Sequence, residues 1–441
     1  MPKTRDICPA LPGQIMLVFL ALYLGGCATY SQRAVSMRDN LVSGRADLAR
    51  IAAEKEDEDQ NDVLASLNKG MLRRMTNDFA GSNQILEVAK QQMESLYGVS
   101  VTDTAASLTI NDALRAYKGP RYEQVLLHAY MAMNYLQLNE PDSARVEMLQ
   151  ADVKMMEWGG QPDEDPFVRY FSGMIYEALG ENDQALVSYR KARDVYLATR
   201  NEQLLEVPLM LKKDLLRLLA DQGLSDEYTR LKSEFGLAGF APEKVSADFG
   251  ELIVILNTGL APIRTESAVM TFSSEVQGHV RVAFPVYSHE PRPAAKARVK
   301  IGGKVLDLEV VENIDRLARQ ALDEEMPLVM TRAIARAVVK YKSQSSAQDQ
   351  NALAGFLLTV TNLATERADT RSWTTLPQEI QIARVLLPVG QHNGNIEIVN
   401  AAGRVVDVIE VGVDIQPGQH RFLTRHWVAP VPAKTYMATS K

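Results

Sequence analysis

The sequence predicts an α+β multidomain protein in which a helical array precedes a β-rich domain. Its 441 residues are enough to bury more than one hydrophobic core. Up to about residue 240 the apolar residues recur at helical spacing, and from about residue 247 they mostly alternate with polar ones, as in half-buried strands. The formal net charge of -7 argues against a nucleic-acid partner, because such proteins normally carry a basic surface.

The N-terminal segment predicts export. Lys3 and Arg5 precede an apolar run, residues 15–24, that is too short to span a bilayer but suits a signal peptide. The run ends in Leu24, Gly25, Gly26 and Cys27, which together resemble a bacterial lipobox. That resemblance implies that residues 1–26 are removed and that Cys27 carries lipid, palmitate included. An ordinary signal peptide or a short buried helix is the alternative.

The predicted anchor also indicates a compartment. Ala28 follows the cysteine, whereas an aspartate in this place favours retention in the inner membrane in lipoproteins of this kind. We therefore expect a lipid-anchored protein of the bacterial outer membrane, on its periplasmic face. Each buried CH₂ of an acyl chain contributes roughly 0.8 kcal/mol to such anchoring, so several chains hold a protein stably.

Residues 166–196 carry the pattern of a tetratricopeptide (TPR) helix–turn–helix. Gly173 and Ala185 are small enough to let two helices approach, and Tyr176 and Tyr189 are spaced to fill the volume beside them. Similar pairs are expected from residue 62, from Tyr122 and, with Gly223 at its turn, from Leu204.

The predicted repeats are irregular. Ala144 and Ala185 occupy equivalent positions but lie 41 residues apart, against about 34 in a usual repeat. We therefore divide this half into a helical region with a degenerate repeat, residues 27–120, and a TPR-like array, residues 121–240.

Four side chains are candidates for a partner groove in this array: Tyr122, Tyr135, Arg169 and Tyr176. The tyrosines lie on apolar helix faces, so packing between helices is one interpretation of them. The other is that they line a concave groove for a peptide, as in many solenoid arrays.

The β-rich, sandwich-like domain is expected over residues 247–430, with a helical insertion at 312–366 and a tail at 431–441. Strands are predicted at residues 252–256, 280–286, 297–301, 305–310, 381–389, 395–400, 404–411 and 420–427. Gly302 and Gly303 predict a two-residue hairpin turn, and Asn393-Gly394 and Ala402-Gly403 predict further turns.

The insertion has three predicted parts. Pro327 is expected to kink or restart its helix, residues 343–350 are expected to form a polar linker, and the apolar residues 352–363 a buried helix. Arg332, Arg336 and Lys340 form a basic stripe at intervals of four. Such a stripe is usually a solvated face, and contact with anionic lipid or murein is the alternative.

No catalytic, cofactor or metal site is predicted. Ser372 has no base near it in the sequence, and we expect Asp369 to pair with Arg371 in an ordered loop. His420 and His426 lie on one face of a predicted strand, but no carboxylate or cysteine pattern accompanies them along the chain. We therefore expect a protein that is not an enzyme.

Several motifs together resemble one family. They are the lipobox, the degenerate helix pairs, GELIVILNTGLAP at 250–262, TRAIARAVVKY at 331–341, and ADTRSWTTLP at 368–377 followed by IQIAR. They resemble a largely uncharacterised family of bacterial outer-membrane lipoproteins with TPR-like repeats, over nearly the whole chain. ADTRSW is the most specific part. The resemblance implies the location and architecture, and associates the chain with accessories of envelope and peptidoglycan assembly.

Two functions follow as expectations. The first is a tethered periplasmic scaffold whose array binds an envelope protein. The alternative is a lipoprotein whose β domain binds glycan, murein or lipopolysaccharide, and an enzyme is the third and weakest interpretation.

Overall fold

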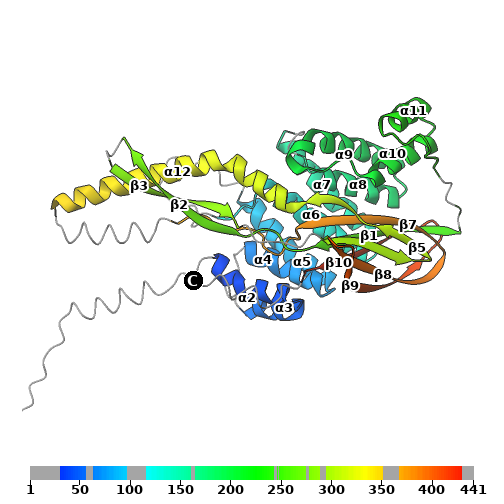
Figure 1. Ribbon diagram of the computed structural model, residues 1–441, viewed down its shortest axis with the longest axis horizontal. Coiled ribbons are helices and arrows are strands. Elements are labelled where there is room, and N and C mark those ends of the chain that lie inside the picture. The colour runs from blue at the N-terminus through cyan, green and yellow to red at the C-terminus, as the bar shows by residue number, and fades with distance from the viewer. Residues whose placement is uncertain are drawn as a thin grey trace, which may run out of the picture.

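The computed structural model describes residues 30–55, 63–96, 116–159, 164–242, 246, 248–274, 278–288, 295–350 and 367–429. Helices precede strands, so the α+β prediction is confirmed (Figure 1). The description of the β half as sandwich-like stays a prediction. The signal peptide, the lipobox, the apolar segment 352–363 and the tail lie outside the described residues.

The helical half is built from consecutive helix pairs. Its helices are α2 (Tyr30–Val42), α3 (Ala46–Lys55), α4 (Val63–Met75), α5 (Phe79–Ser95), α6 (Arg121–Gln137), α7 (Pro141–Glu157), α8 (Pro166–Ala178), α9 (Asn182–Gln203), α10 (Leu209–Asp221) and α11 (Ser225–Glu234). The pairs α4/α5, α6/α7, α8/α9 and α10/α11 each pack together, where the sequence predicts them.

One turn geometry recurs in all four pairs. The residue that ends each turn has a left-handed backbone: Asn77, Asn139, Gly180 and Gly223. In each case the next amide donates to the carbonyl five residues before it, at 2.8 or 2.9 Å. This hydrogen bond caps the first helix and reverses the chain. The shared turn makes the four pairs structural repeats of the TPR type.

Small residues let the helices of a pair approach, as predicted. A Cβ on Gly70 would overlap the side chain of Leu86, and one on Gly173 would overlap the ring of Tyr189. The hydroxyl of Ser82 also donates to the carbonyl of Gly70 at 2.7 Å. Close approach therefore depends on the missing side chains.

The strands form two four-stranded sheets and a two-stranded ribbon. They are β1 (Phe249–Thr258), β2 (Arg264–Ser273), β3 (Gly278–Tyr287), β4 (Ala295–Ile301), β5 (Lys304–Asp307), β6 (Glu309–Asn313), β7 (Glu379–Pro388), β8 (Gly390–Asn400), β9 (Val405–Ile415) and β10 (His420–Trp427). The first sheet has the order β10-β1-β7-β6 and the second β5-β4-β8-β9, while β2 pairs with β3. Strands β1 and β10 are parallel.

Some turn predictions are confirmed and one is wrong. Gly302 and Gly303 have positive φ angles of 58° and 73° and join β4 to β5, as predicted. Gly394, in contrast, lies inside β8, opposite Ile301 and Val411. A Cβ there would overlap the backbone of β4. This glycine therefore permits close strand approach and does not mark a turn.

Two strand predictions also need correction. Strand β2 has no counterpart among the predicted strands. The predicted strand 305–310 is divided between β5 and β6, which belong to different sheets.

The insertion is one helix over its described length. Helix α12 (Ile314–Gln350) continues through Pro327, so it does not restart there, while a kink at Pro327 stays a prediction. The polar linker predicted at 343–350 is helical as well, because those residues include no glycine or proline to end the helix. Among the described helices, none combines the length and the apolar character needed to cross a membrane.

Strands β2 and β3 and helix α12 leave the body of the protein side by side, and we call them the arm (Figure 1). A small cluster holds the ribbon to the helix, with Val280 and Val282 of β3 against Ala333 and Ala337 of α12.

The first sheet lies between the helical array and the second sheet. Along β1, Leu252 and Val254 join a cluster shared with the second sheet, whereas Ile253 and Ile255 join the core of the helical array. Adjacent residues of a strand point to opposite faces, so this alternation buries both sides of the sheet. One core thus crosses the predicted boundary between residues 240 and 247.

The first helix of every pair faces this sheet. Arg74 of α4 contacts Thr424, Tyr130 of α6 donates to Asn257 at 3.1 Å, Phe171 of α8 packs edge-on against Phe422 at 6.3 Å, and Asp214 of α10 accepts from Arg384 at 2.7 Å. The face of the array that these helices form is therefore covered by the chain's own sheet.

Candidate functional site

The structure places the predicted groove residues in separate surroundings. Tyr122 and Arg169 are buried, while Tyr135 and Tyr176 are partly buried against the core. The hydroxyl of Tyr122 donates to Glu123 at 3.3 Å. Arg169 donates to Glu164 at 2.6 Å and also contacts Asp152. These contacts lie within the chain, and a partner groove at the four residues stays a prediction. Cys27, Leu24, Gly25 and Gly26 lie outside the described residues.

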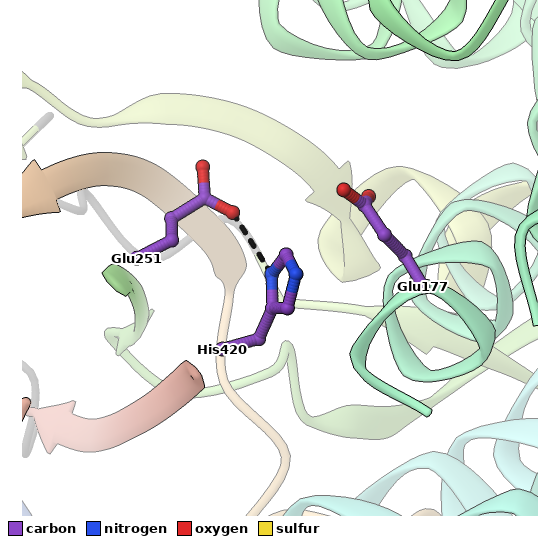
Figure 2. A group of neighbouring side chains, drawn as sticks. All are labelled: Glu177, Glu251 and His420. Atoms are coloured by element: carbon purple, nitrogen blue, oxygen red, sulfur yellow. Dashed lines mark hydrogen bonds and ion pairs between the residues drawn. The ribbon is translucent and has the colours of Figure 1, made fainter. Parts of the chain in front are cut away.

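A group of ionisable side chains lies where the array meets the sheet. Glu177 of α8, Glu251 of β1 and His420 of β10 each offer one ligand-type atom, and these atoms all lie within 4.8 Å of one another (Figure 2). Nδ1 of His420 lies 3.0 Å from Oε2 of Glu251. Two carboxylates and an imidazole are ligands that zinc accepts, so this group is a candidate metal site.

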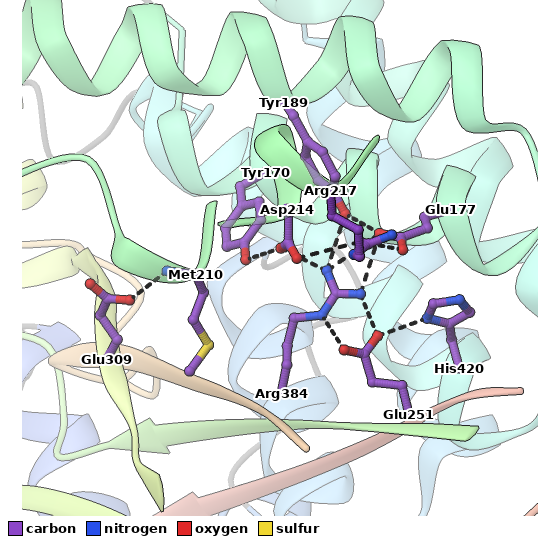
Figure 3. A network of polar contacts seen from close by, with 10 residues as sticks. All are labelled: Tyr170, Glu177, Tyr189, Met210, Asp214, Arg217, Glu251, Glu309, Arg384 and His420. Carbon is purple, nitrogen blue, oxygen red and sulfur yellow. Dashed lines mark hydrogen bonds and ion pairs between the residues drawn. The ribbon is translucent and has the colours of Figure 1, made fainter. Parts of the chain in front are cut away.

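Arg384 of β7 lies between these two carboxylates. Its Nη2 atom donates to Glu177 at 3.3 Å and also contacts Glu251, so the guanidinium takes the place of a cation between the carboxylates. Its Nε donates to Glu251 at 3.0 Å, and its Nη1 to Asp214 at 2.7 Å. The cluster is therefore a set of ion pairs that joins helices α8 and α10 to the sheet, and the donor set does not fit a metal (Figure 3).

A second layer of contacts completes this junction network. Arg217 pairs with Glu177 at 2.5 Å and with Asp214 at 3.4 Å. The hydroxyls of Tyr170 and Tyr189 donate to Asp214 and Glu177, each at 2.7 Å. Buried charges are tolerated only when paired and hydrogen-bonded, and each carboxylate here meets that condition.

The pKa values of the junction network follow from this geometry. Burial by itself raises the pKa of Glu251, but Arg384 and His420 outweigh it and lower that pKa well below its usual range. The pKa of Glu177 is lowered in the same way by Arg384 and Arg217. For Asp214 the burial dominates and its pKa is raised. The network is thus most favourable when Arg384 and the glutamates are charged.

A buried pair of carboxyl groups joins α8 to β6. Oδ1 of Asp165 caps α8 by accepting from the amide of Val168 at 2.8 Å, and Oε1 of Glu312 accepts from the amide of Asn313 at 2.8 Å. Burial and the neighbouring carboxyl raise the pKa of Glu312 well above its usual range, and burial raises that of Asp165 to about 6. Two such groups share a proton readily, since both cannot ionise at low cost.

The ADTRSW segment has a structural role. Asp369 pairs with Arg371 at 2.8 Å, as predicted. The amide of Trp373 donates to the buried Glu123 at 3.0 Å, and its ring meets Tyr130 edge-on with centroids 6.0 Å apart. The hydroxyl of Ser372 is buried and has no hydrogen-bond partner among the described residues.

Helix α7 is apolar on two sides. Ala144, Met148 and Ala151 are buried in the array core, as the repeat requires. On the opposite side, Val146, Leu149, Val153 and Met156 are 44–62% exposed. Their spacing of three, four and three residues places them in one line along the helix. We call these four residues the α7 stripe.

The charges beside the α7 stripe are acidic at both ends. Asp142 precedes it and Glu157 follows it, and both side chains are exposed, with Arg145 within 3.9 Å of Asp142. Lys154 lies alongside, within 3.9 Å of Glu94. Spacing of this kind is typical of helices that pack against another helix, but among the described residues nothing covers the stripe.

No protein-family model and no curated protein matches the chain. Among solved structures, MamA AMB-1 is 17% identical with a TM-score of 0.30, and the match covers 47% of this chain and 92% of that one. MamA MSR-1 is 18% identical with a TM-score of 0.28, covering 47% and 99%.

Replacing Arg384 with methionine is expected to destabilise the protein by roughly 3–5 kcal/mol at pH 7, because the buried carboxyl groups of Glu177 and Asp214 and the partly buried one of Glu251 lose their main counter-charge. The loss should shrink as pH falls towards 4. The lowered pKa of Glu251 gives the parent stability that is present above the ordinary glutamate pKa of about 4.3 and is lost below it. Urea unfolding at several pH values measures both effects.

The matched control is Arg230→Met, whose parent side chain is 61% exposed and is expected to contribute less than about 0.5 kcal/mol. Equal losses in the two variants would show that the junction network does not hold the array to the sheet.

Glu312→Gln is expected to flatten the dependence of stability on pH between 5 and 8. Raised carboxyl pKa values favour folding at low pH, and this contribution is lost as pH rises through about 6, the pKa of Asp165. The free energy of unfolding of the variant should therefore exceed that of the parent by on the order of 1–3 kcal/mol at pH 8, and should differ little from it at pH 5. Glu410→Gln, at an exposed position of β9, should keep the parent's slope. If the stability of Glu312→Gln depended on pH as steeply as that of the parent, a proton shared between Asp165 and Glu312 would be excluded.

Proposed function

We propose that the chain is a lipid-anchored scaffold of the bacterial envelope that docks a protein partner on the α7 stripe. The observation that carries the proposal is the line of four exposed apolar side chains on a helix whose other side is already buried. A helix that is apolar on both sides is normally covered on both sides.

The architecture supports docking on this side. The first helices of the pairs are occupied by the chain's own sheet, through contacts such as those of Tyr130 and Phe171. That face, on which a solenoid array often binds peptides, is filled here. Helix α7 is a second helix of its pair and presents its stripe away from that contact.

The chemistry of the stripe specifies its occupant. Residues spaced by three and four match the knobs of one helix packed into the holes of another. Acidic Asp142 and Glu157 at the two ends favour a basic neighbour. We therefore assign the stripe to an amphipathic helix of another envelope protein, with basic residues beside its apolar line.

The anchor in this proposal is Cys27, and the outer membrane with the periplasmic face is the compartment. Both rest on the sequence: the lipobox, and alanine in place of aspartate at residue 28. Glycan or murein binding by the β domain stays an alternative prediction, and no contact among the described residues favours it.

Cys27→Ser is expected to abolish incorporation of labelled palmitate and to release the chain from membranes under a high-salt wash, because no acyl chain remains to hold it. Fractionation of cells that produce each form measures this. Ser31→Ala, four residues beyond the lipobox, should label and fractionate like the parent. Labelling of the Cys27→Ser chain would contradict the anchor.

The docking surface is tested with a photo-crosslinking amino acid at Leu149 in living cells. We expect an adduct whose cross-linked peptide is an amphipathic helix with basic residues. Val153→Lys with Met156→Lys should reduce it about tenfold or more, since charges then replace the apolar centre of the contact.

The same cross-linker at Gln184, an exposed polar position of α9, is the control and should give no such adduct. Three results would contradict the proposed surface: no adduct at Leu149, an adduct that the two lysines leave unchanged, or an adduct only with a second copy of this chain.

A further inference from the structure

We propose that the outer half of the arm is a docking surface for anionic phospholipid bilayers. This half comprises the ends of β2 and β3 next to their turn and residues 328–342 of α12. The inference goes beyond the proposed function, because it concerns a different surface and does not need the α7 stripe.

The shape of the arm makes its side chains available. The ribbon and the helix project together from the body (Figure 1). Val280 and Val282 occupy the ribbon face that packs on α12. Residues directly opposite in the register lie on the same face. Met270 with Arg281, and Phe272 with His279, therefore form the other face, which points away from α12.

That open face is apolar where it is most exposed. Met270 is 63% exposed and Phe272 is 61% exposed. The ring of Phe272 meets that of His279 edge-on, with centroids 5.7 Å apart. Aromatic and other large apolar side chains beside cationic ones are the residues that enter the headgroup region of a bilayer.

The charge of the outer half is opposite to that of the chain. Residues 328–342 include Arg332, Arg336, Lys340 and Lys342 and no acidic residue, whereas the whole chain carries -7. Arg336 is only 3% exposed, so the prediction of a solvated stripe is wrong at this residue, which adds to the net charge of the segment without reaching its surface. The electrostatic potential of the segment depends on this net charge even where single side chains have partners. Each basic residue near an anionic membrane surface contributes about 1 kcal/mol of attraction.

The distribution of the apolar residues favours lipid over a protein. Leu328, Ile334 and Val339 of α12 are exposed, in addition to Met270 and Phe272 on the ribbon. Leu328 and Val339 lie on the side of the helix opposite Ala333 and Ala337, as the 100° spacing per residue requires. The exposed apolar residues thus surround the arm and form no single groove. A fluid headgroup region can cover such a surface, whereas a folded partner would need one complementary face.

The test uses the chain from residue 28 onward, without lipid, and vesicles that carry no other protein. We expect sedimentation with phosphatidylglycerol vesicles, little with phosphatidylcholine vesicles, and binding at least about tenfold weaker when salt is raised from 0.05 to 0.5 M. Met270→Ser with Phe272→Ser should weaken binding to phosphatidylglycerol on the order of tenfold.

The matched control is Val405→Ser with Val406→Ser. These two side chains of β9 are 45% and 53% exposed, so the control removes exposed apolar side chains from the body. It should bind vesicles like the parent. Circular dichroism and thermal unfolding of both double variants show whether each remains folded.

A second measurement places the contact on the arm even if the double variant unfolds. Phe272→Trp should add fluorescence that brominated phosphatidylglycerol quenches, while Val406→Trp should not. The proposal is overturned if the chain does not bind phosphatidylglycerol vesicles, if it binds phosphatidylcholine vesicles equally well, or if the fluorescence of Phe272→Trp is not quenched in the bound chain.

Discussion

The ion pairs of Arg384 are the interaction on which the rest of the structure depends. This one guanidinium joins β7 to α8, α10 and β1 through Glu177, Asp214 and Glu251. The side chains of Arg384, Glu177 and Asp214 are each at most 8% exposed, so these charges have exchanged water for protein partners. Such a network adds less stability than its contacts suggest, because its charges lose hydration on burial. Removing one member is nevertheless strongly destabilising, since it leaves a buried charge without a partner. The network therefore fixes the position of the array on the sheet.

That position decides where the protein can bind anything. Since the first helices of the pairs pack on the first sheet, the array does not offer them to a peptide. Among the described residues, apolar side chains remain exposed on the α7 stripe and on the arm. Both expose apolar side chains that none of the described residues covers, but they differ in form. The stripe is one straight line beside acidic residues, whereas the arm is apolar on several sides and basic.

The helix pairs were predictable because their signals are local. A small residue such as Gly173, an aromatic residue such as Tyr189 and a turn between them lie within one short stretch. The hairpin at Gly302-Gly303 is equally local. Gly394 was misread because a glycine can serve a turn or a close strand contact, and the choice between them depends on β4. Strand β2 was missed because much of it is exposed, so burial does not impose a strict alternation on it.

By itself the sequence determined most of the helices and strands, the order of helices before strands, and the pairing of Asp369 with Arg371. The lipid anchor stays a prediction. Only the tertiary structure decided that the first sheet covers the face of the array formed by the first helices of the pairs. It also decided that carboxylates lie beside His420. Those carboxylates, Glu177 and Glu251, lie far from His420 in the chain, and no spacing rule connects them. The physical reason is that helices, turns and short ion pairs arise from neighbours in sequence, whereas a buried charge network is specified by which surfaces pack together.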